Sequence, residues 1–123
     1  MDAPILIVED DAEIRELLGG FLADEGFAVR AVADGRGMDR AFAEAVPRLV
    51  ILDVMLPGRS GYDILRDIRA DPVMADLPVL MLTARGQTRD RELAAAAGAS
   101  HFMAKPFSNA EVLQTVRSLA GPA

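Results

Sequence analysis

The sequence predicts an α/β protein with a doubly wound parallel sheet, and three observations support this class. Short, nearly continuous runs of Ile, Val and Leu recur along the chain, as they do in strands that are buried on both faces. Segments with helical periodicity separate these runs. Strict alternation of the two element types over 123 residues indicates parallel strands joined by right-handed crossovers, with helices on both faces.

Five segments are predicted to be strands. The three most apolar, expected at the centre of the sheet, are residues 4–8, 49–52 and 79–82. The other two are residues 27–33 and 100–104.

Five helices are predicted between and after these strands. The first has an apolar stripe at i, i+3, i+4 and i+7 spacing, made by Ile14, Leu17, Leu18, Phe21 and Leu22, and Gly26 is placed to end it. Two adjacent glycines inside this helix each cost about 1 kcal/mol relative to alanine, so burial of the stripe must hold it. The next three helices are expected at residues 37–45, 62–69 and 93–97, and a Ser-Asn-Ala-Glu capping pattern at residues 108–111 opens the last.

The composition limits the classes of function. A hydrophobic content of 51% with 26% charged residues is typical of a globular core, and we expect one domain over residues 1–123. The chain has no cysteine and one histidine, His101, which argues against disulfides, thiol chemistry, a His-rich metal site and a Ser-His-Asp triad. The formal net charge of -6 argues against direct contact with nucleic acid. No apolar run is long enough to span a membrane and the first residues lack a signal-peptide pattern, so we expect a cytoplasmic protein.

Polar residues follow four of the predicted strands. Glu9 and Asp10 come after the first strand, Asp53 after the third, Thr83 after the fourth and Lys105 after the fifth. The carboxyl ends of parallel strands form one edge of the sheet, where such folds bind ligands. Each residue alone could be a helix cap, which is the commoner role for a single Asp or Thr in this place. Four strand ends together favour a functional site.

The acidic residues of this group predict a metal ion. Glu9, Asp10 and Asp53 would repel one another in the absence of a cation, and Lys105 balances only part of their charge. Oxygen ligands alone favour Mg²⁺. Asp11 is expected to act as the N-cap of the first helix and not as a metal ligand.

The order of these residues resembles that of the receiver domains of two-component response regulators, the CheY-like superfamily. The resemblance covers essentially the whole chain and rests on Glu9-Asp10, on "LVILDVMLPGRSGYD" around Asp53, on "PVLMLTARG" around Thr83 and on "HFMAKPF" around Lys105. It implies a flavodoxin-like sheet of order 2-1-3-4-5 with five helices. It also implies a signalling module in which Asp53 takes a phosphoryl group from a phosphohistidine on a sensor histidine kinase or histidine phosphotransfer protein. Such a domain catalyses its own Mg²⁺-dependent phosphorylation and dephosphorylation.

The resemblance implies a role for each metal-site residue. Asp53 would be the phosphoacceptor, and Glu9, Asp10 and Asp53 would hold Mg²⁺ together with the backbone carbonyl of Met55. Because successive strand residues point to opposite sides, we expect Asp10 to bind the metal directly and Glu9 to act partly through water.

Further residues are assigned to phosphoryl transfer and switching. Thr83 and Lys105 would neutralise the phosphoryl oxygens, and a cis bond between Lys105 and Pro106 is expected. Thr83 and Phe102 are the predicted switch pair, with a plain core role for Phe102 as the alternative. Phosphorylation would change the face made by the fourth helix, fifth strand and fifth helix, through which a downstream protein partner is controlled.

Residues around the site carry weaker predictions. Met55 and Arg85 are expected to tune the lifetime of the phosphorylated state. Pro57-Gly58 and Gly61, in the loop after Asp53, are interpreted mainly as turn formers; the alternative, implied by the resemblance, is that the backbone of this loop must lie close to the metal. His101 is predicted to be an exposed or edge residue and not a phosphoryl donor. Alanines at 94–97 lack the charges that pair across the usual dimer face, so we expect a monomer or a weak phosphorylation-dependent dimer.

Two other functions are less consistent with the sequence. An aspartyl-phosphate hydrolase would resemble a pattern with a second Asp two residues after the nucleophile, and position 55 is Met. A receiver-like module that only docks partners is disfavoured by the complete set of site residues.

Overall fold

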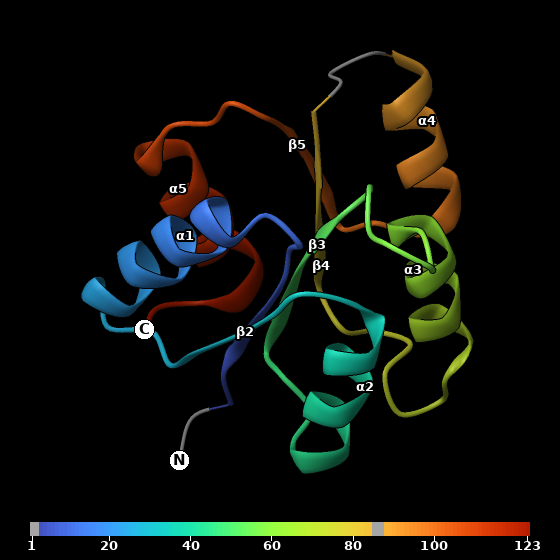
Figure 1. Cartoon of the computed structure of the whole chain (residues 1–123), viewed down its shortest axis with the longest axis horizontal. Helices are drawn as coiled ribbons and strands as arrows, with labels where there is room; N and C mark the ends of the chain where they lie inside the picture. Colours follow the sequence, from blue (N-terminus) through green and yellow to red (C-terminus); the bar gives the residue numbers. More distant parts are fainter. Residues whose placement is uncertain (1–2, 85–87) are drawn as a thin grey trace.

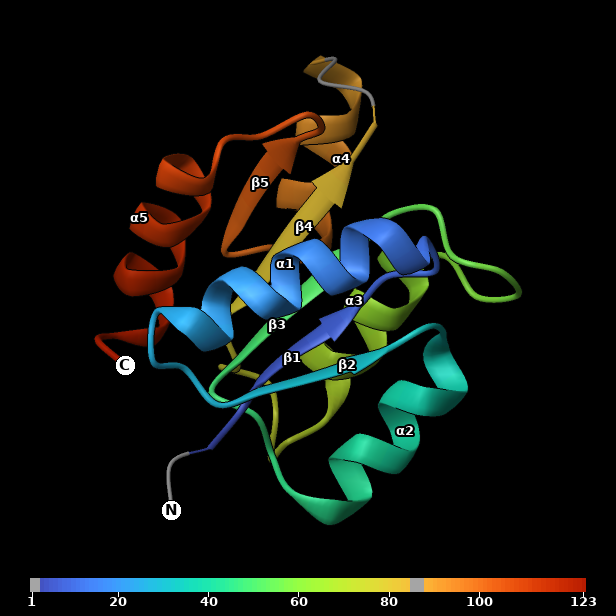
Figure 2. The ribbon, with the colours of Figure 1, turned by 60° about the vertical axis from the view of Figure 1, so that its left-hand side comes forward.

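Five parallel strands form one sheet in the order β2-β1-β3-β4-β5, which is the order that the resemblance implied. The computed structural model describes residues 3–84 and 88–123, and within α4 it leaves the side chains of residues 88–90 undescribed. The arrangement of the strands is visible in Figure 2. Their bounds are β1 (Ile5–Val8), β2 (Val29–Val32), β3 (Leu49–Asp53), β4 (Val79–Thr83) and β5 (His101–Ala104).

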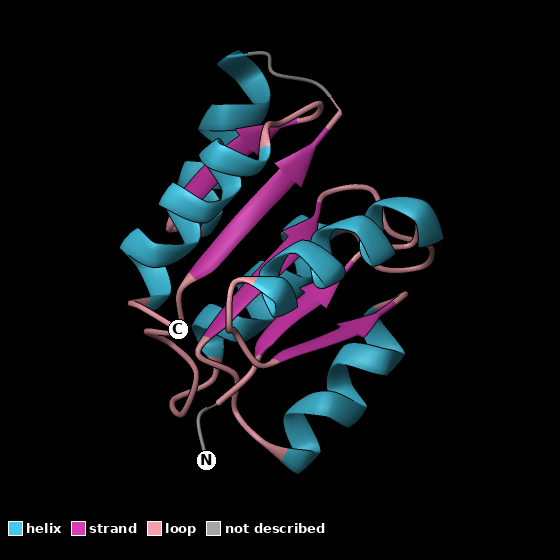
Figure 3. Ribbon diagram, turned by 90° about the vertical axis from the view of Figure 1, so that its left-hand side faces the viewer, coloured by secondary structure: helices cyan, strands magenta, loops and turns pink. Residues whose placement is uncertain are grey.

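Helices cover both faces of the sheet. They are α1 (Ala12–Asp24), α2 (Gly35–Glu44), α3 (Gly61–Ala70), α4 (Thr88–Ala97) and α5 (Asn109–Ala120). Helices α1 and α5 lie on one face, and α2, α3 and α4 lie on the other (Figures 1 and 3). In the part of the chain that is described, no helix is both long and apolar enough to cross a membrane.

Alternation along the central strands supplies both cores. In β1, Ile5 and Ile7 pack with the buried residues of α1 and α5. Leu6 and Val8 point the other way and pack with those of α2 and α3. All four side chains are buried, which explains why this strand has an uninterrupted apolar sequence.

Most elements begin and end within two residues of their predicted bounds, and two of the differences have a clear physical cause. The second strand covers Val29–Val32 and not residues 27–33, because Phe27 is buried in the α1 and α5 core while lying outside the sheet ladder. The fourth helix begins at Thr88, well before the predicted residue 93. Its first half is polar in sequence, so apolar periodicity could not reveal it.

Side-chain caps begin the helices that flank the strand ends. The Asp11 carboxylate Oδ1 accepts hydrogen bonds from the backbone N–H groups of Glu13 (2.9 Å) and Ile14 (3.2 Å), which confirms its predicted role as the N-cap of α1. The Ser108 hydroxyl accepts from the Glu111 N–H at 3.1 Å and caps α5, as the sequence pattern predicted. These caps define where the loops at the site end.

Arg48 ties the end of α5 to the start of β3. Its guanidinium donates to the carbonyl oxygens of Ala120 (3.2 Å) and Pro122 (2.8 Å), and it lies over the Phe27 ring with Cζ 5.6 Å from the centroid. Cations are favourable at a helix C-terminus because they satisfy carbonyls that have no partner within the helix.

Candidate functional site

The carboxyl ends of β1, β3, β4 and β5 bring the predicted polar residues together. Asp53 pairs with Leu82 in the ladder, and Thr83 pairs with Ala104. The backbone N–H of Lys105 donates to the Thr83 carbonyl at 2.7 Å, which extends the pairing of β4 and β5 to the lysine. The register therefore places residues from four strand ends around one site.

Three carboxylates converge at this edge of the sheet. Glu9, Asp10 and Asp53 each offer an oxygen, and these oxygens lie within 4.8 Å of one another. Glu9 is fully buried and Asp53 is 4% exposed, whereas Asp10 is exposed. Hard oxygen ligands in such a cluster suit Mg²⁺, and the exposed Asp10 leaves one side of the cluster open to solvent.

Lys105 bridges the two buried carboxylates. Its Nζ lies 2.6 Å from Glu9 Oε1 and 3.1 Å from Asp53 Oδ2. Burial by itself lowers the pKa of Lys105, but the hydrogen bond to Glu9 and the charge of Asp53 outweigh burial, so the pKa is raised above its usual value. The lysine therefore remains charged and compensates one of the acids.

The excess of negative charge in the site affects the pKa of Glu9. Burial, together with the hydrogen-bonded and charged neighbour Asp53, outweighs the hydrogen bond to Lys105 and raises the pKa of Glu9 to about 7. Three carboxylates face one lysine, so two negative charges have no partner when all three acids are ionised, and a divalent cation would balance them.

The Asp53 carboxylate is held at both oxygens. Oδ2 accepts from Lys105 Nζ, and Oδ1 accepts from the backbone N–H of Met55 at 3.0 Å. Met55 itself, two residues after Asp53, is 71% exposed. These contacts limit rotation of the acidic group before any reaction.

Gly61 allows a close approach of two backbones beside Asp53, whereas the sequence interpretation favoured turn geometry for it. A Cβ atom at this position would lie 2.3 Å from the carbonyl oxygen of Asp53 and 2.9 Å from the Cα of Val54. Gly61 is the first residue of α3, and its φ is not among the positive ones, so the turn interpretation is wrong for it. Gly58, with φ +81°, does adopt a turn conformation that favours glycine. The glycine itself can be read from the sequence, but its close approach to the Asp53 backbone is visible only in the folded structure.

The predicted switch residues lie along the β4 and β5 side of the site. Thr83 ends β4 and is 3% exposed. Phe102 in β5 is half-buried and packs against the core on the α2, α3 and α4 face. The guanidinium of Arg91 in α4 lies over its ring, with Cζ 5.5 Å from the centroid. The aromatic side chain therefore contacts both the core and a surface cation.

Three smaller predictions have different outcomes. The bond between Lys105 and Pro106 is cis, as predicted. His101 is exposed in the edge strand β5, also as predicted. Arg85 lies outside the described residues, so its proposed tuning role stays a prediction from sequence.

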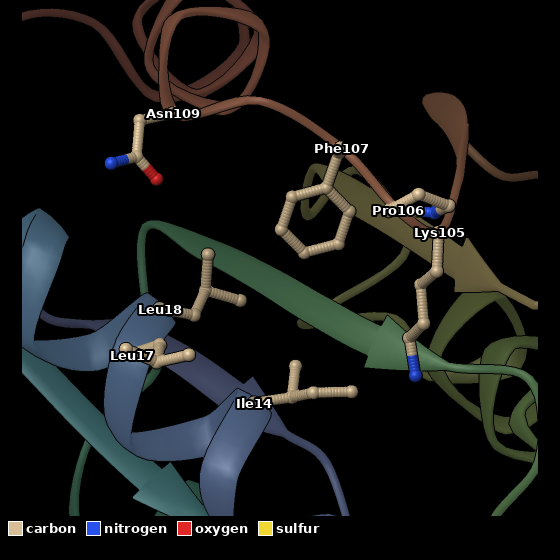
Figure 4. Close-up of a pocket in the computed structure, with 7 residues that line it drawn as sticks. All are labelled: Ile14, Leu17, Leu18, Lys105, Pro106, Phe107 and Asn109. Carbon is tan, nitrogen blue, oxygen red and sulfur yellow. The ribbon is translucent and has the colours of Figure 1, made fainter.

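An apolar hollow adjoins the site on the α1 side (Figure 4). It has a volume of about 410 Å³ and is lined by Ile14, Leu17, Leu18, Lys105, Pro106, Phe107 and Asn109. Leu17 is 68% exposed, although it belongs to the predicted apolar stripe of α1. Lys105 lines this hollow and also contacts Asp53, so the hollow and the acidic site share this lysine.

A doubly wound parallel sheet with a lysine and three carboxylates at its strand ends defines the class of the protein as a flavodoxin-like domain built around an acidic site. The chain belongs to the response regulator receiver family of two-component signalling, because the model described as "Response regulator receiver domain" matches residues 5–117.

Curated relatives and solved structures agree with this assignment. The chain is 43% identical over 115 residues to the transcriptional regulatory protein GltR of Pseudomonas aeruginosa, covering 94% of this chain and 48% of GltR. It is 41% identical over 114 residues to the DNA-binding response regulator MtrA of Mycolicibacterium paratuberculosis, covering 93% of this chain and 49% of MtrA. The chain thus spans about half the length of these relatives.

Two solved structures illustrate the fold and the site. A putative response regulator from Chloroflexus aurantiacus is 34% identical, with a TM-score of 0.92 and 98% of each chain covered. The receiver domain of a sensor histidine kinase from Pseudomonas aeruginosa PAO1 is 31% identical, with a TM-score of 0.88 and coverage of 98% of this chain and 99% of that one. That receiver domain was solved with a magnesium ion coordinated in the active-site cleft.

Proposed function

We propose that Asp53 accepts a phosphoryl group from a phosphohistidine on a sensor histidine kinase or a histidine phosphotransfer protein. The observation that carries the proposal is the Asp53 carboxylate itself. It is buried, it contacts Lys105 at 3.1 Å, and it shares an oxygen cluster with Glu9 and Asp10. In the transfer, an Asp53 oxygen forms a bond to phosphorus while the bond between phosphorus and the donor imidazole nitrogen breaks. The domain is its own catalyst.

The same carboxylates are suited to hold Mg²⁺. Asp10 is exposed and would bind the ion directly, whereas Glu9 is engaged by Lys105 and would act partly through water. The backbone carbonyl of Met55 is proposed as a further ligand. When bound, Mg²⁺ would neutralise charge on the phosphoryl oxygens.

Lys105 and Thr83 have complementary roles in this reaction. A carboxylate is a weak nucleophile, so the site must orient it and stabilise the charge that develops on the transferred group. The Lys105 ammonium lies beside Asp53 Oδ2 and would pair with a phosphoryl oxygen. Thr83 ends the adjacent strand, and its hydroxyl would donate to another oxygen.

Phosphorylation is proposed to change the α4, β5 and α5 face. The phosphoryl group adds about two negative charges and strong acceptors beside Thr83, which would draw its hydroxyl inward. Phe102 would then turn further into the protein and leave its contact with Arg91. Phosphorylation would shift the conformational equilibrium toward the altered face, and a downstream protein or output domain would recognise that face. Arg91 and the ring offer a contact that differs between the two states.

The apolar hollow beside Lys105 is the surface that we assign to the phosphohistidine donor protein. The donor must bring its phosphoryl group to Asp53, and Lys105 both lines the hollow and contacts Asp53. Leu17→Ser is expected to slow transfer from a phosphorylated donor protein and to leave modification by acetyl phosphate unchanged. Slowing of both reactions would remove the docking role.

The wider setting follows from this assignment. We propose that the domain acts in the cytoplasm and makes no direct contact with nucleic acid, in keeping with its net charge of -6. GltR and MtrA are named as transcriptional and DNA-binding regulators, and we propose that DNA contact in those two proteins belongs to the part that this chain does not match. A monomer or a weak phosphorylation-dependent dimer is proposed, since Ala95 and Ala96 expose uncharged side chains on α4.

Intact-mass analysis tests the chemistry. Acetyl phosphate with Mg²⁺ is expected to add one phosphoryl group to the parent protein and none to Asp53→Asn. Asp63→Asn, at an exposed aspartate of α3, is the matched control and should be modified as the parent is. Full modification of Asp53→Asn, or of the parent in excess chelator, would show that the site or its metal dependence is wrong. A parent that is never modified would favour a module that only docks partners.

A further inference from the structure

Arg15 connects the first turn of α1 to the backbone of the acidic pair. Its Nη1 atom donates to the carbonyl oxygen of Glu9 at 2.8 Å and lies 3.4 Å from the carbonyl oxygen of Asp10. One guanidinium nitrogen therefore contacts two successive carbonyl groups. Arg15 is half-buried, so these contacts are partly shielded from competing water.

The two acidic residues are held in different ways. Glu9 is fixed through its side chain, because Oε1 accepts from Lys105 at 2.6 Å and Oε2 accepts from the Asp11 N–H at 3.3 Å. The Glu9 N–H also donates to the Val32 carbonyl at 3.1 Å. Among the described residues, none forms a hydrogen bond or ion pair with the exposed Asp10 carboxylate. The direction of the Asp10 side chain therefore depends on its backbone.

We propose that Arg15 is a positioning residue for Asp10 as a metal ligand, an inference that rests on the proposed binding of Mg²⁺. The carbonyl groups of Glu9 and Asp10 belong to the two peptide planes that flank the Asp10 Cα atom. Holding both carbonyls restricts rotation of these planes, and so it restricts the direction in which the Asp10 carboxylate leaves the backbone. The contact keeps this carboxylate beside Glu9 and Asp53, where their oxygens lie within 4.8 Å.

The sign of the effect separates positioning from simple electrostatics. Arg15 carries a positive charge near an acidic cluster, so removing that charge alone should leave Mg²⁺ affinity unchanged or raise it. Removing a positioning contact should lower the affinity. Outer hydrogen-bond partners of metal ligands typically change metal affinity 10- to 100-fold when they are lost. We therefore expect Arg15→Ala to weaken Mg²⁺ binding by about 10-fold.

The experiment is a titration of the unphosphorylated full chain with MgCl₂, followed by ¹H–¹⁵N NMR shifts of the residues around Asp53. The parent, Arg15→Ala, Arg15→Lys and Arg40→Ala are compared at one ionic strength. Arg40 is an exposed arginine of α2, so Arg40→Ala makes the same change in net charge without touching the loop. Arg15→Lys keeps the charge and one donor group, and it should recover part of the lost affinity. Arg40→Ala should retain the parent dissociation constant.

The outcomes distinguish this inference from the proposed function. Equal dissociation constants for the parent and Arg15→Ala would overturn the positioning role while leaving the metal site intact. Tighter binding by Arg15→Ala would show that only its charge matters, which also overturns the role. A parent that shows no saturable response to MgCl₂ would instead remove the metal site on which the inference rests. If Arg15→Ala does not fold, Arg15→Gln is judged by the same criterion.

Discussion

Replacing Gly61 with alanine should both destabilise the protein and disturb its phosphoacceptor. The added Cβ would lie 2.3 Å from the Asp53 carbonyl oxygen. Carbon and carbonyl oxygen atoms in contact lie about 3.3–3.6 Å apart, so the two backbones must separate by roughly 1 Å. The added Cβ is fixed to the backbone at a helix start and the oxygen belongs to the backbone of a central strand, so neither can move away as the end of a flexible side chain would.

The expected magnitude follows from two opposing effects. Overpacking a tight site costs about 1–3 kcal/mol. Alanine is a better helix former than glycine by up to about 1 kcal/mol, but this gain is smaller at the first helical position than in the interior. We expect Gly61→Ala to lower the free energy of unfolding by about 2 kcal/mol. Because the displacement falls on Asp53, we also expect phosphorylation by acetyl phosphate to slow by up to about 100-fold.

Urea denaturation and timed intact-mass analysis measure the two effects. Gly20→Ala is the matched control, because a Cβ at Gly20, in the interior of α1, has no neighbour within 4 Å. The free energy of unfolding of Gly20→Ala should be about 1 kcal/mol higher than that of the parent, and its phosphorylation rate should be unchanged. If Gly61→Ala were as stable as the parent and reacted as fast, the close approach of α3 to Asp53 would not be the reason for glycine at this position.

Three further predictions concern the acidic site and its mouth. Loss of the helix cap in Asp11→Ala should lower the free energy of unfolding by about 1 kcal/mol, but this variant should keep the rise in melting temperature that Mg²⁺ gives. Asp10→Ala should lose that rise. Thermal melts that show the reverse would exchange the roles of the two residues. Without Mg²⁺, the folded protein holds a proton on Glu9 up to about pH 7 while the unfolded chain releases it near 4.5, so the free energy of unfolding should fall as pH rises across this window. Urea denaturation at several pH values should show that the free energy of unfolding falls by up to about 3 kcal/mol in the parent, and that this fall is absent in Glu9→Gln. If the free energy of unfolding depended on pH equally in both proteins, Glu9 would not be the group responsible. Met55→Ala should shorten the lifetime of phosphorylated Asp53, because the exposed side chain beside the acceptor restricts hydrolytic water, and an unchanged decay by mass analysis would rule this out.

Local patterns in the sequence were sufficient for the element types and for the composition of the site. Burial of β1 on both faces follows from its uninterrupted apolar residues, and the Asp11 cap follows from its place before an apolar stripe. Glu9, Asp53 and Lys105 could be assigned to one edge because every strand in a parallel sheet ends on the same side. The strand order itself rested on resemblance to a family.

Contacts between distant segments were decided by the tertiary structure. Lys105 reaches both Glu9 and Asp53, Arg15 contacts two carbonyls of a loop, and Gly61 lies against the backbone of β3. None of these contacts leaves a periodic or compositional mark, because each depends on how two backbones approach after the sheet and its helices have packed. Periodicity and capping act over a few residues, and they determine which face of an element is buried. The distance between two such elements is set by the packing of the whole core, which is why the glycine in contact with Asp53 was mistaken for a turn residue.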